Sequence, residues 1–277
     1  MVGIPWTPVP GERLLTHPDV AADTWLHELT ATLRETTREL ATGLHLVFAT
    51  ESDAWFMKRG GGFSRVGVQY QWLNRGYRDF EDFLSGFTSR QRKKIRRERR
   101  ALDAYDFVHE RGPSPERVRQ LGGLYLENSA RYGQGIWMNE RFFQVLGDTW
   151  RDRIHTVTAW SGDRLVAGAL DVEKNGSLYG RYWGYAEEIP YMHFEVCYYQ
   201  GIDYAIRTGL QLFDPGHGGD HKFRRGFEPS LTRSSHWFPD PRFQQGFSRY
   251  AREERTHLQR YIDDLKERSP LRPRAER

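Results

Sequence analysis

Three strand-like segments separated by short turns constrain the fold of this chain more than any other feature. Apolar and aromatic residues run through residues 154–160, 164–173 and 178–185, and the segments are separated by Ser161-Gly162-Asp163 and Asn175-Gly176. Glycine-containing turns of this kind are the usual connections of β-hairpins. The three segments therefore predict an antiparallel meander.

Helical and strand-like segments lie on both sides of the meander. Helical spacing precedes it at residues 115–132 and 140–150, and a helix at 193–207 and strands at 210–213 and 230–238 follow it. Upstream, residues 4–15 are expected to be extended, 22–40, 51–58 and 79–102 helical, and 44–48 and 66–72 strands. Apolar residues spaced from Phe243 to Leu265 predict a long C-terminal helix, and we expect the tail after Ser269 to be disordered. This order predicts an α/β fold of the α+β kind.

The composition argues against membrane insertion. Hydrophobic residues make up 38% and charged residues 28% of the 277 residues. No apolar run approaches the roughly 18 residues that a spanning helix needs, and the start of the chain lacks the pattern of a signal peptide. The single cysteine, Cys197, excludes an internal disulfide and is expected to lie in the core. We therefore expect a cytoplasmic protein.

A polar segment follows the predicted strand at 210–213. Residues 213–227 combine a glycine-rich stretch with two carboxylates, two imidazoles and three cations, which are Asp214, Asp220, His217, His221, Lys222, Arg224 and Arg225. Core packing does not require this mixture, whereas acid–base chemistry beside fixed cations does. Ligands of open α/β sheets also bind beyond the carboxyl ends of strands. The segment is therefore the leading candidate for a site that binds an anionic substrate and moves protons.

Two other interpretations of this segment remain open. Asp-Pro-Gly is a turn signal, so the segment can be a solvated connection. His217 and His221 are four residues apart with Asp214 nearby, a spacing that gathers metal ligands on a helix. Proline and glycine argue against that helix and no cysteine pair completes a ligand set, so we expect no metal.

A second candidate feature is a run of positive charge. Residues 90–100 contain eight cations and one acid. On a helix, Arg90, Lys93, Arg97 and Arg100 share one exposed face, with Lys94 beside them. Like charges on neighbouring turns repel, so this helix gains from an anion lying against it. We expect these residues to bind an acidic donor, with a plain solvated face as the alternative.

Three blocks of the sequence carry a resemblance to a known family. The first is residues 89–99, the second joins residues 178–184 to 193–201, and the third joins Phe213-Asp214-Pro215-Gly216 to His221-Lys222 and Arg225-Gly226-Phe227. Together with the element order, they resemble the Fem-like branch of the GNAT acyltransferase superfamily, whose members are labelled peptidoglycan biosynthesis or recognition proteins. The resemblance covers about residues 4–269.

The resemblance implies two GNAT-like halves side by side. Relatives carry more sequence before the region that matches Ile4, so the first half is expected to be reduced. Residues 1–78 would form this partial half, residues 79–269 a complete acyltransferase half with the C-terminal helix, and residues 270–277 a disordered tail.

The resemblance also implies the reaction. Fem-type enzymes transfer an amino acid from aminoacyl-tRNA to an amine, and other GNAT enzymes use coenzyme A or carrier-protein thioesters. The coenzyme A loop pattern is missing after residue 183, and its nearest look-alike, Arg131-Tyr132-Gly133-Gln134-Gly135, has the wrong place and spacing. We therefore expect an N-acyltransferase that takes its donor from a macromolecule, aminoacyl-tRNA ahead of acyl carrier protein or coenzyme A, and a small-molecule amine as acceptor. No tightly bound cofactor is expected. The alternative is a non-catalytic protein that binds RNA or a cell-wall precursor.

The expected chemistry assigns roles to individual residues. A general base is expected at Glu195 or His193, next to the meander, with Asp214, His221 and Lys222 completing the catalytic set. The expected substrate contacts are Arg181, Tyr182, Trp183, Tyr199, His217 and Arg225. For Glu195, His193, Tyr182, Lys222 and Arg225, a structural role as cap, core or solvated loop residue is the alternative.

Overall fold

The computed structural model describes residues 8–14, 17, 19, 22–133 and 138–272. Its strands form one mixed sheet of eight in the order β1-β8-β2-β7-β6-β5-β4-β3. The chain divides into two compact units. Unit 1 comprises Met1–Gln69 and Pro229–Arg268, and unit 2 comprises Tyr70–Glu228 and Ser269–Arg277.

The predicted meander is confirmed and forms the centre of unit 2. Its strands are β4 (Ile154–Ser161), β5 (Arg164–Lys174) and β6 (Ser177–Tyr185), all antiparallel. The β5–β6 turn has positive φ at both Asn175 and Gly176, 50° and 71°, which matches the right-handed twist of the hairpin. A further edge strand, β3 (Asp106–Arg111), pairs with β4 and was not predicted. Its polar sequence alternates weakly, as an edge strand permits.

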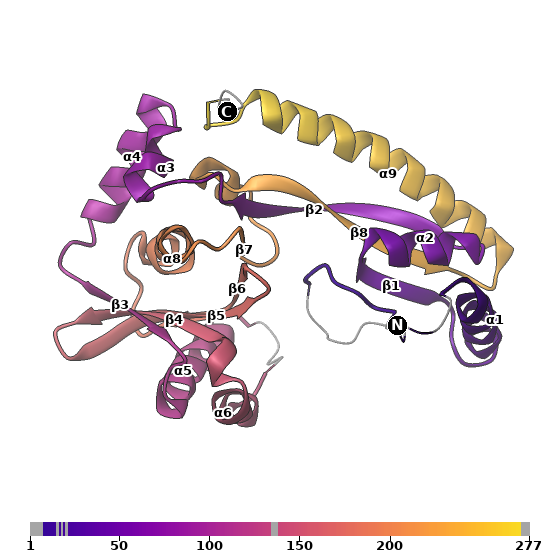
Figure 1. Ribbon diagram of the computed structural model, residues 1–277, viewed down its shortest axis with the longest axis horizontal. Helices are drawn as coiled ribbons and strands as arrows, with labels where there is room; N and C mark the ends of the chain where they lie inside the picture. The colour runs from indigo at the N-terminus through magenta and orange to yellow at the C-terminus, as the bar shows by residue number, and fades with distance from the viewer. Residues whose placement is uncertain (1–7, 15–16, 18, 20–21, 134–137, 273–277) are drawn as a thin grey trace. The chain divides into compact units, whose positions relative to one another are not determined.

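Helices cover both faces of this part of the sheet. Figure 1 shows α5 (Pro115–Arg131) and α6 (Glu140–Thr149) on one face and α8 (Gln200–Thr208) on the other. The contact with α5 is close, because a Cβ on Gly184 of β6 would lie 2.2 Å from the carbonyl carbon of Leu124. Val118, Leu121, Phe143, Ile154 and Leu170 fill the layer between.

The helix predicted at residues 79–102 is two helices in the structure, so that prediction was wrong in its middle. The chain forms α3 (Phe80–Ser85), bends at residues 86–88, and continues as α4 (Ser89–Arg100). Gly86 ends α3, and Thr88 is the N-cap residue of α4. The apolar residues still share one side, since Phe80, Leu84, Phe87, Ile95 and Leu102 are all buried.

A π-helical turn interrupts the helix that follows the meander. The chain passes through α7 (Met192–Phe194), a π-helical turn (Glu195–Tyr199) and then α8, which ends at Gly209 with φ 72°. Strand β7 (Leu212–Asp214) runs parallel to β6 and is antiparallel to β2 (Phe63–Leu73). The polar segment then forms a loop at residues 215–219 and a 3₁₀ helix, Asp220–Arg225, where only a loop was predicted.

Unit 1 contains α1 (Ala22–Leu40), β1 (Leu44–Ala49), α2 (Glu51–Arg59) and α9 (Pro241–Glu267), with most of β2 and β8 (Glu228–Trp237). Its core includes Leu44, Leu46, Met57 and Trp237. Of the expected extended segment 4–15, residues 8–14 lack regular structure and the others lie outside the described residues.

The start of the expected C-terminal tail is paired within unit 2. The carbonyl of Pro270 accepts a hydrogen bond from the N–H of Thr88, and the N–H of Arg272 donates to the carbonyl of Gly86. Residues 273–277 lie outside the described residues.

Candidate functional site

Strands β6 and β7 part at the polar segment. They pair only from Ser177 to Tyr179 with Leu212 to Asp214, and β6 then continues to Tyr185 paired with β5 alone. The chain after β7 turns away through Pro215 and Gly216, whose φ is 88°. This parting brings the end of β6, the loop after β7 and the start of the helix at Met192 into one region of unit 2.

Lys222 is buried beside this parting. Its side chain belongs to a residue that is 3% exposed, and its Nζ donates to the carbonyls of Gly216 at 2.7 Å and His217 at 3.3 Å. Burial lowers the pKa of Lys222 to about 8, against the opposing charge of Asp214. An ammonium has three N–H donors, so one remains for a ligand. The structure thus makes Lys222 a fixed, nearly dry cation.

Asp214 is fully buried at the end of β7. Its Oδ1 accepts from the N–H of Gly216 at 2.9 Å, and its Oδ2 accepts from Nε2 of Gln71 at 3.3 Å. These bonds hold the loop after β7 in its tight turn. Asp214 therefore positions the loop and supplies the negative charge that faces Lys222.

Two neutral imidazoles lie close to these groups. His193 stacks on Trp183 with ring centroids 4.4 Å apart, and its centroid is 6.1 Å from that of His221. Burial lowers the pKa of His193 to about 3, and the neighbouring His221, Lys222 and Arg225 lower it further. Burial and the same two cations also lower the pKa of His221, whose Nε2 lies 2.9 Å from the hydroxyl of Tyr198. Both rings are therefore proton acceptors at neutral pH.

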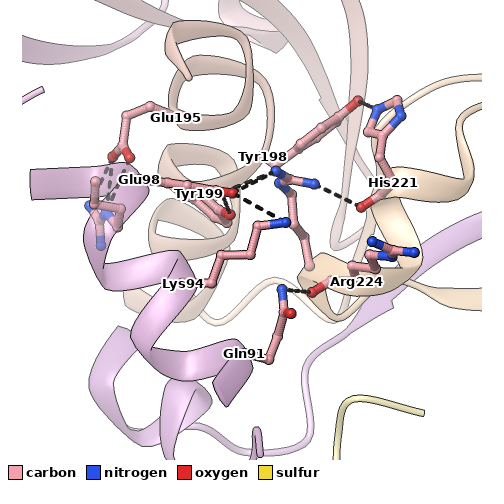
Figure 2. A network of polar contacts seen from close by, with 10 residues as sticks. Gln91, Lys94, Glu98, Glu195, Tyr198, Tyr199, His221 and Arg224 are labelled. Carbon is pink, nitrogen blue, oxygen red and sulfur yellow. Dashed lines mark hydrogen bonds and ion pairs between the residues drawn. The ribbon is translucent and has the colours of Figure 1, made fainter. Parts of the chain in front are cut away.

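Arg225 takes part in a buried ion pair. Its Nη2 donates to both carboxylate oxygens of Glu98 in α4, at 3.1 and 3.0 Å, and the hydroxyl of Tyr199 donates to the same carboxylate at 2.6 Å. Glu98 is 2% and Arg225 3% exposed. Figure 2 shows Glu98 of α4 meeting Tyr199 of the π-helical turn, with Lys94 at the edge of the cluster. Glu98 is the one acid among the cations of α4, and its burial ties that helix to the 3₁₀ helix.

Glu195 lies in a different cluster from Lys222. Its carboxylate accepts from Nε of Arg99 at 3.0 and 3.2 Å and from Nε2 of Gln200 at 2.7 Å. Burial raises the pKa of Glu195, while Arg99 and Gln200 oppose that rise. Figure 2 shows Glu195 on the opposite side of the network from His221. The structure thus brings His193, His221 and Lys222 together and sets Glu195 apart.

A cavity of about 650 Å³ opens beside Glu195. We call it the α4 groove; it lies within unit 2, and its lining residues are Glu81, Leu84, Lys93, Arg96, Arg99, Arg100, Leu102, Asp103, Tyr105, Phe107, Glu195 and Gln200. Arg96 pairs with Glu81, and Arg99 with Glu195. The groove is therefore rich in cations, and part of their charge is already paired.

The outer side of α4 carries the predicted cationic face, defined as Arg90, Lys93, Arg97 and Arg100. All four residues are exposed, as predicted, while Ile95 is fully buried beneath them. Lys94 is half-buried and lies 3.9 Å from Glu98. The face thus presents charge outward without a role in packing.

The remaining predicted contacts divide between the two faces of β6. Tyr182 packs against Tyr125, Phe142 and Phe143 of α5 and α6. Arg181 lies near Asp214 and Asp171, and Trp183 faces His193. His217 contributes its carbonyl to Lys222. Tyr182 therefore lies in an aromatic layer across the sheet from His193.

Sequence reasoning missed Arg99, Gln200 and Tyr198, which contact the predicted residues directly. The sequence did contain a signal for Glu98, which is the one acid among eight cations. An acid at that position relieves the repulsion between the cations of the helix, so its presence indicated a paired carboxylate. Within the described residues, no three His, Cys, Asp or Glu side chains gather as metal ligands. Nor does any described helix have the length and apolar content to cross a membrane.

Comparison with solved structures identifies the fold class of this chain. FemX matches at 13% identity over 88% of this chain and 84% of that chain, with a TM-score of 0.51. The C-terminal domain of a putative lysylphosphatidylglycerol synthetase from Agrobacterium fabrum matches at 10% identity over 84% and 78%, with a TM-score of 0.53. A tandem GNAT protein from the clavulanic acid biosynthesis pathway matches at 14% identity over 85% and 77%, with a TM-score of 0.50. The fold is thus the α+β fold of GNAT-like acyltransferases.

The family is narrower than the fold. Residues 1–273 match the FemAB-like family, described as peptidoglycan biosynthesis/recognition, and the chain belongs to that family. A search among curated proteins found no match. The predicted resemblance to Fem-like acyltransferases is confirmed.

Proposed function

We propose that this protein is an N-acyltransferase that forms an amide bond between an acyl group from a macromolecular carrier and a small-molecule amine. The observation that carries this proposal is the buried Lys222, with one N–H free where β6 and β7 part. Amide formation passes through a negatively charged tetrahedral oxygen. A preorganised donor in a site with little water stabilises that charge far better than water does.

The neighbouring imidazoles supply the proton transfer. The amine nitrogen attacks the carbonyl carbon, the bond from that carbon to the carrier oxygen or sulfur breaks, and the amine loses one proton. His221 takes that proton and returns it to the leaving oxygen or sulfur. His193 has a pKa of about 3, which makes it a weak base, and its stacking on Trp183 suits it to shaping the acyl pocket.

The donor proposed first is aminoacyl-tRNA, with acyl carrier protein and acyl-coenzyme A as alternatives. The exposed cationic face of α4 supports a polyanionic partner, since lysines and arginines gain affinity by releasing counterions from nucleic acid. The Fem-like resemblance and the missing coenzyme A loop pattern favour the same donor. A cytoplasmic location follows from such a donor.

We also propose that unit 1 corresponds to a reduced first GNAT-like half. The match to a tandem GNAT protein over 85% of this chain supports this relation. Unit 1 contains three strands and three helices along its described residues, fewer than unit 2. The acyl-transfer site is proposed for unit 2 alone.

The test offers the full-length protein aminoacyl-tRNAs, acyl carrier proteins and acyl-coenzyme A with amines from a cell extract, and reads products by mass spectrometry. An amide product is expected, and Lys222→Met should lower its rate about a hundredfold. The matched control Lys174→Met removes an exposed cation at the end of β5 and should change the rate less than threefold. The acyltransferase proposal fails if no donor yields an amide, and RNA binding without product would favour the binding protein instead. An amide whose rate is the same in both variants removes Lys222 from the reaction.

A further inference from the structure

A continuous chain of polar contacts crosses unit 2 from the α4 groove into the sheet. Nε2 of Gln200 lies 2.7 Å from Oε1 of Glu195, and Oε1 of Gln200 lies 2.8 Å from Nε2 of His109. Nδ1 of His109 lies 3.0 Å from Nε2 of His155, whose Nδ1 lies 3.1 Å from Oδ2 of Asp171. His155 is fully buried, and Asp171, Gln200 and Glu195 are buried as well. We call these five residues the Glu195–Asp171 chain.

The chain has more hydrogen-bond contacts than its ordinary protonation states can supply with hydrogens. Each of its four contacts needs one hydrogen between the two atoms. Ionised carboxylates supply none, each neutral imidazole supplies one, and the amide of Gln200 donates on one side while accepting on the other. Three hydrogens are therefore available for four contacts. Without a fourth, two buried acceptors would face each other, which costs free energy in a dry interior.

We propose that the Glu195–Asp171 chain binds one proton beyond those of two neutral imidazoles, and that Glu195 is the end through which it exchanges that proton with the α4 groove. This chain is a second proton-handling site, apart from Lys222 and His221, and its protonation does not depend on the proposed reaction. Glu195 and Gln200 line the groove, whereas His155 is closed off from solvent.

Two arrangements satisfy every contact with the same number of protons. In the first, protonated Glu195 donates to Oε1 of Gln200, whose Nε2 faces His109, and both imidazoles carry hydrogen on Nδ1. In the second, Glu195 is ionised and accepts from Nε2 of Gln200, both imidazoles carry hydrogen on Nε2, and the extra proton lies between His155 and Asp171. The two differ by a turn of the Gln200 amide and by both histidine tautomers, so the position of the proton fixes all of them together.

Neighbouring charges act on both ends of the chain. Arg99 of α4 favours ionised Glu195, while its burial and Asp203 of α8 favour the protonated form. Burial, His155 and Arg207 lower the pKa of His109, against Gln200 and Asp203. At the far end, Asp171 lies near Arg181 of β6, Cys197 of the π-helical turn and Tyr204 of α8, whose ring stacks on His155 at 3.7 Å. Neighbouring groups thus act in opposite directions on the position of the proton at the groove end of the chain.

Two isosteric variants test the proposal with opposite expected results. In Asp171→Asn, the new amide donates to Nδ1 of His155, so the chain needs no extra proton and both histidines carry hydrogen on Nε2. In Glu195→Gln, the new amide donates to Oε1 of Gln200, the extra proton is again unnecessary, and both histidines carry hydrogen on Nδ1. The readout is ¹⁵N NMR of the ring nitrogens of His109 and His155 in the full-length protein, which distinguishes protonated from unprotonated nitrogen.

The expected result is a switch of both tautomers between the variants, and a pH titration of these nitrogens in the parent protein that neither variant shows. A chain with only a structural role would keep one set of tautomers in both variants, and that result overturns the proposal. A parent protein in which the ring nitrogens of His109 and His155 do not change with pH overturns it as well. Because each variant alone gives a defined tautomer, failure of one to fold leaves the other as the test, judged against its own expected tautomer.

Discussion

Glu98→Gln is expected to lower the free energy of unfolding by about 3–5 kcal/mol, because it removes the charge that compensates a buried guanidinium. Arg225 is 3% exposed and donates to both oxygens of Glu98, and Tyr199 donates to the same group. The substitution preserves volume, so the loss comes from the unpaired charge. At roughly 2–4 °C of melting temperature per kcal/mol for chains near this size, the midpoint should fall by about 6–20 °C.

The assay compares thermal and urea unfolding of this variant with a matched exposed pair. Glu81→Gln breaks the contact between Glu81 and Arg96, and both side chains of this pair are well exposed. This variant should therefore lower the free energy of unfolding by at most about 1 kcal/mol. A double variant, Glu98→Leu with Arg225→Met, should lose less than the two single losses together, because no charge is then left buried alone. If Glu98→Gln and Glu81→Gln shift the midpoint equally, the buried pair does not hold α4 to the 3₁₀ helix.

Three further predictions follow from burial, charge and packing. The pKa of Lys222 is about 8 in the folded protein and its ordinary value is 10.5, so the unfolded chain binds more protons between these pH values. The free energy of unfolding should therefore rise with pH across that window, and urea titrations of Lys222→Met should show no such rise. Turnover that uses the cation should fall above about pH 8. Replacing the four residues of the cationic face by Ser should leave the melting temperature nearly unchanged. In filter binding with tRNA, the slope of the logarithm of the binding constant against the logarithm of salt concentration should flatten by roughly 1–3 units. Unchanged binding to every donor would make this face a plain solvated surface. Gly184→Ala should abolish the cooperative melting transition or lower the melting temperature sharply in calorimetry, because the new Cβ meets the backbone of Leu124. The control Gly123→Ala, whose Cβ meets nothing within 4 Å, should stabilise α5 by about 0.5–1 kcal/mol in the same measurement.

Local patterns predicted most of the regular elements, because the signals of meander and helices lie within a few residues. The meander followed from its turns at Gly162 and Asn175-Gly176, and α1 begins and ends at the predicted residues. The prediction failed where a polar strand lies at an edge, as in β3, and where α3 and α4 meet at Gly86, because a periodic apolar stripe continues across a bend.

The candidate site was less predictable, because its partners are far apart in the sequence. Glu98 and Arg225 are 127 positions apart, and His109 and Gln200 are 91 apart, so no local pattern joins them. Lys222 was expected beside charged loop residues, but its burial depends on how Gly216 and His217 fold over it. Glu195 and Tyr198, which contacts His221, lie on different sides of the π-helical turn. Because this turn does not follow the α-helical period, the sequence did not show which of its residues share a side.

The π-helical turn also decides which lengths of polypeptide the Glu195–Asp171 chain can tolerate at this point. The N–H of Gln200 donates to the carbonyl of Glu195, five residues back, and this bond sets the two side chains over one another. In an α-helix, residues five apart lie well apart around the axis, at 3.6 residues per turn. A chain shortened by one residue between Glu195 and Tyr199 would close an ordinary α-helical turn. The carboxyl and amide residues would then be four apart and still neighbours on one face, and the buried faces before and after the turn would be retained. A protein of this fold can therefore gain or lose a single codon here without rebuilding its core or breaking the chain of contacts.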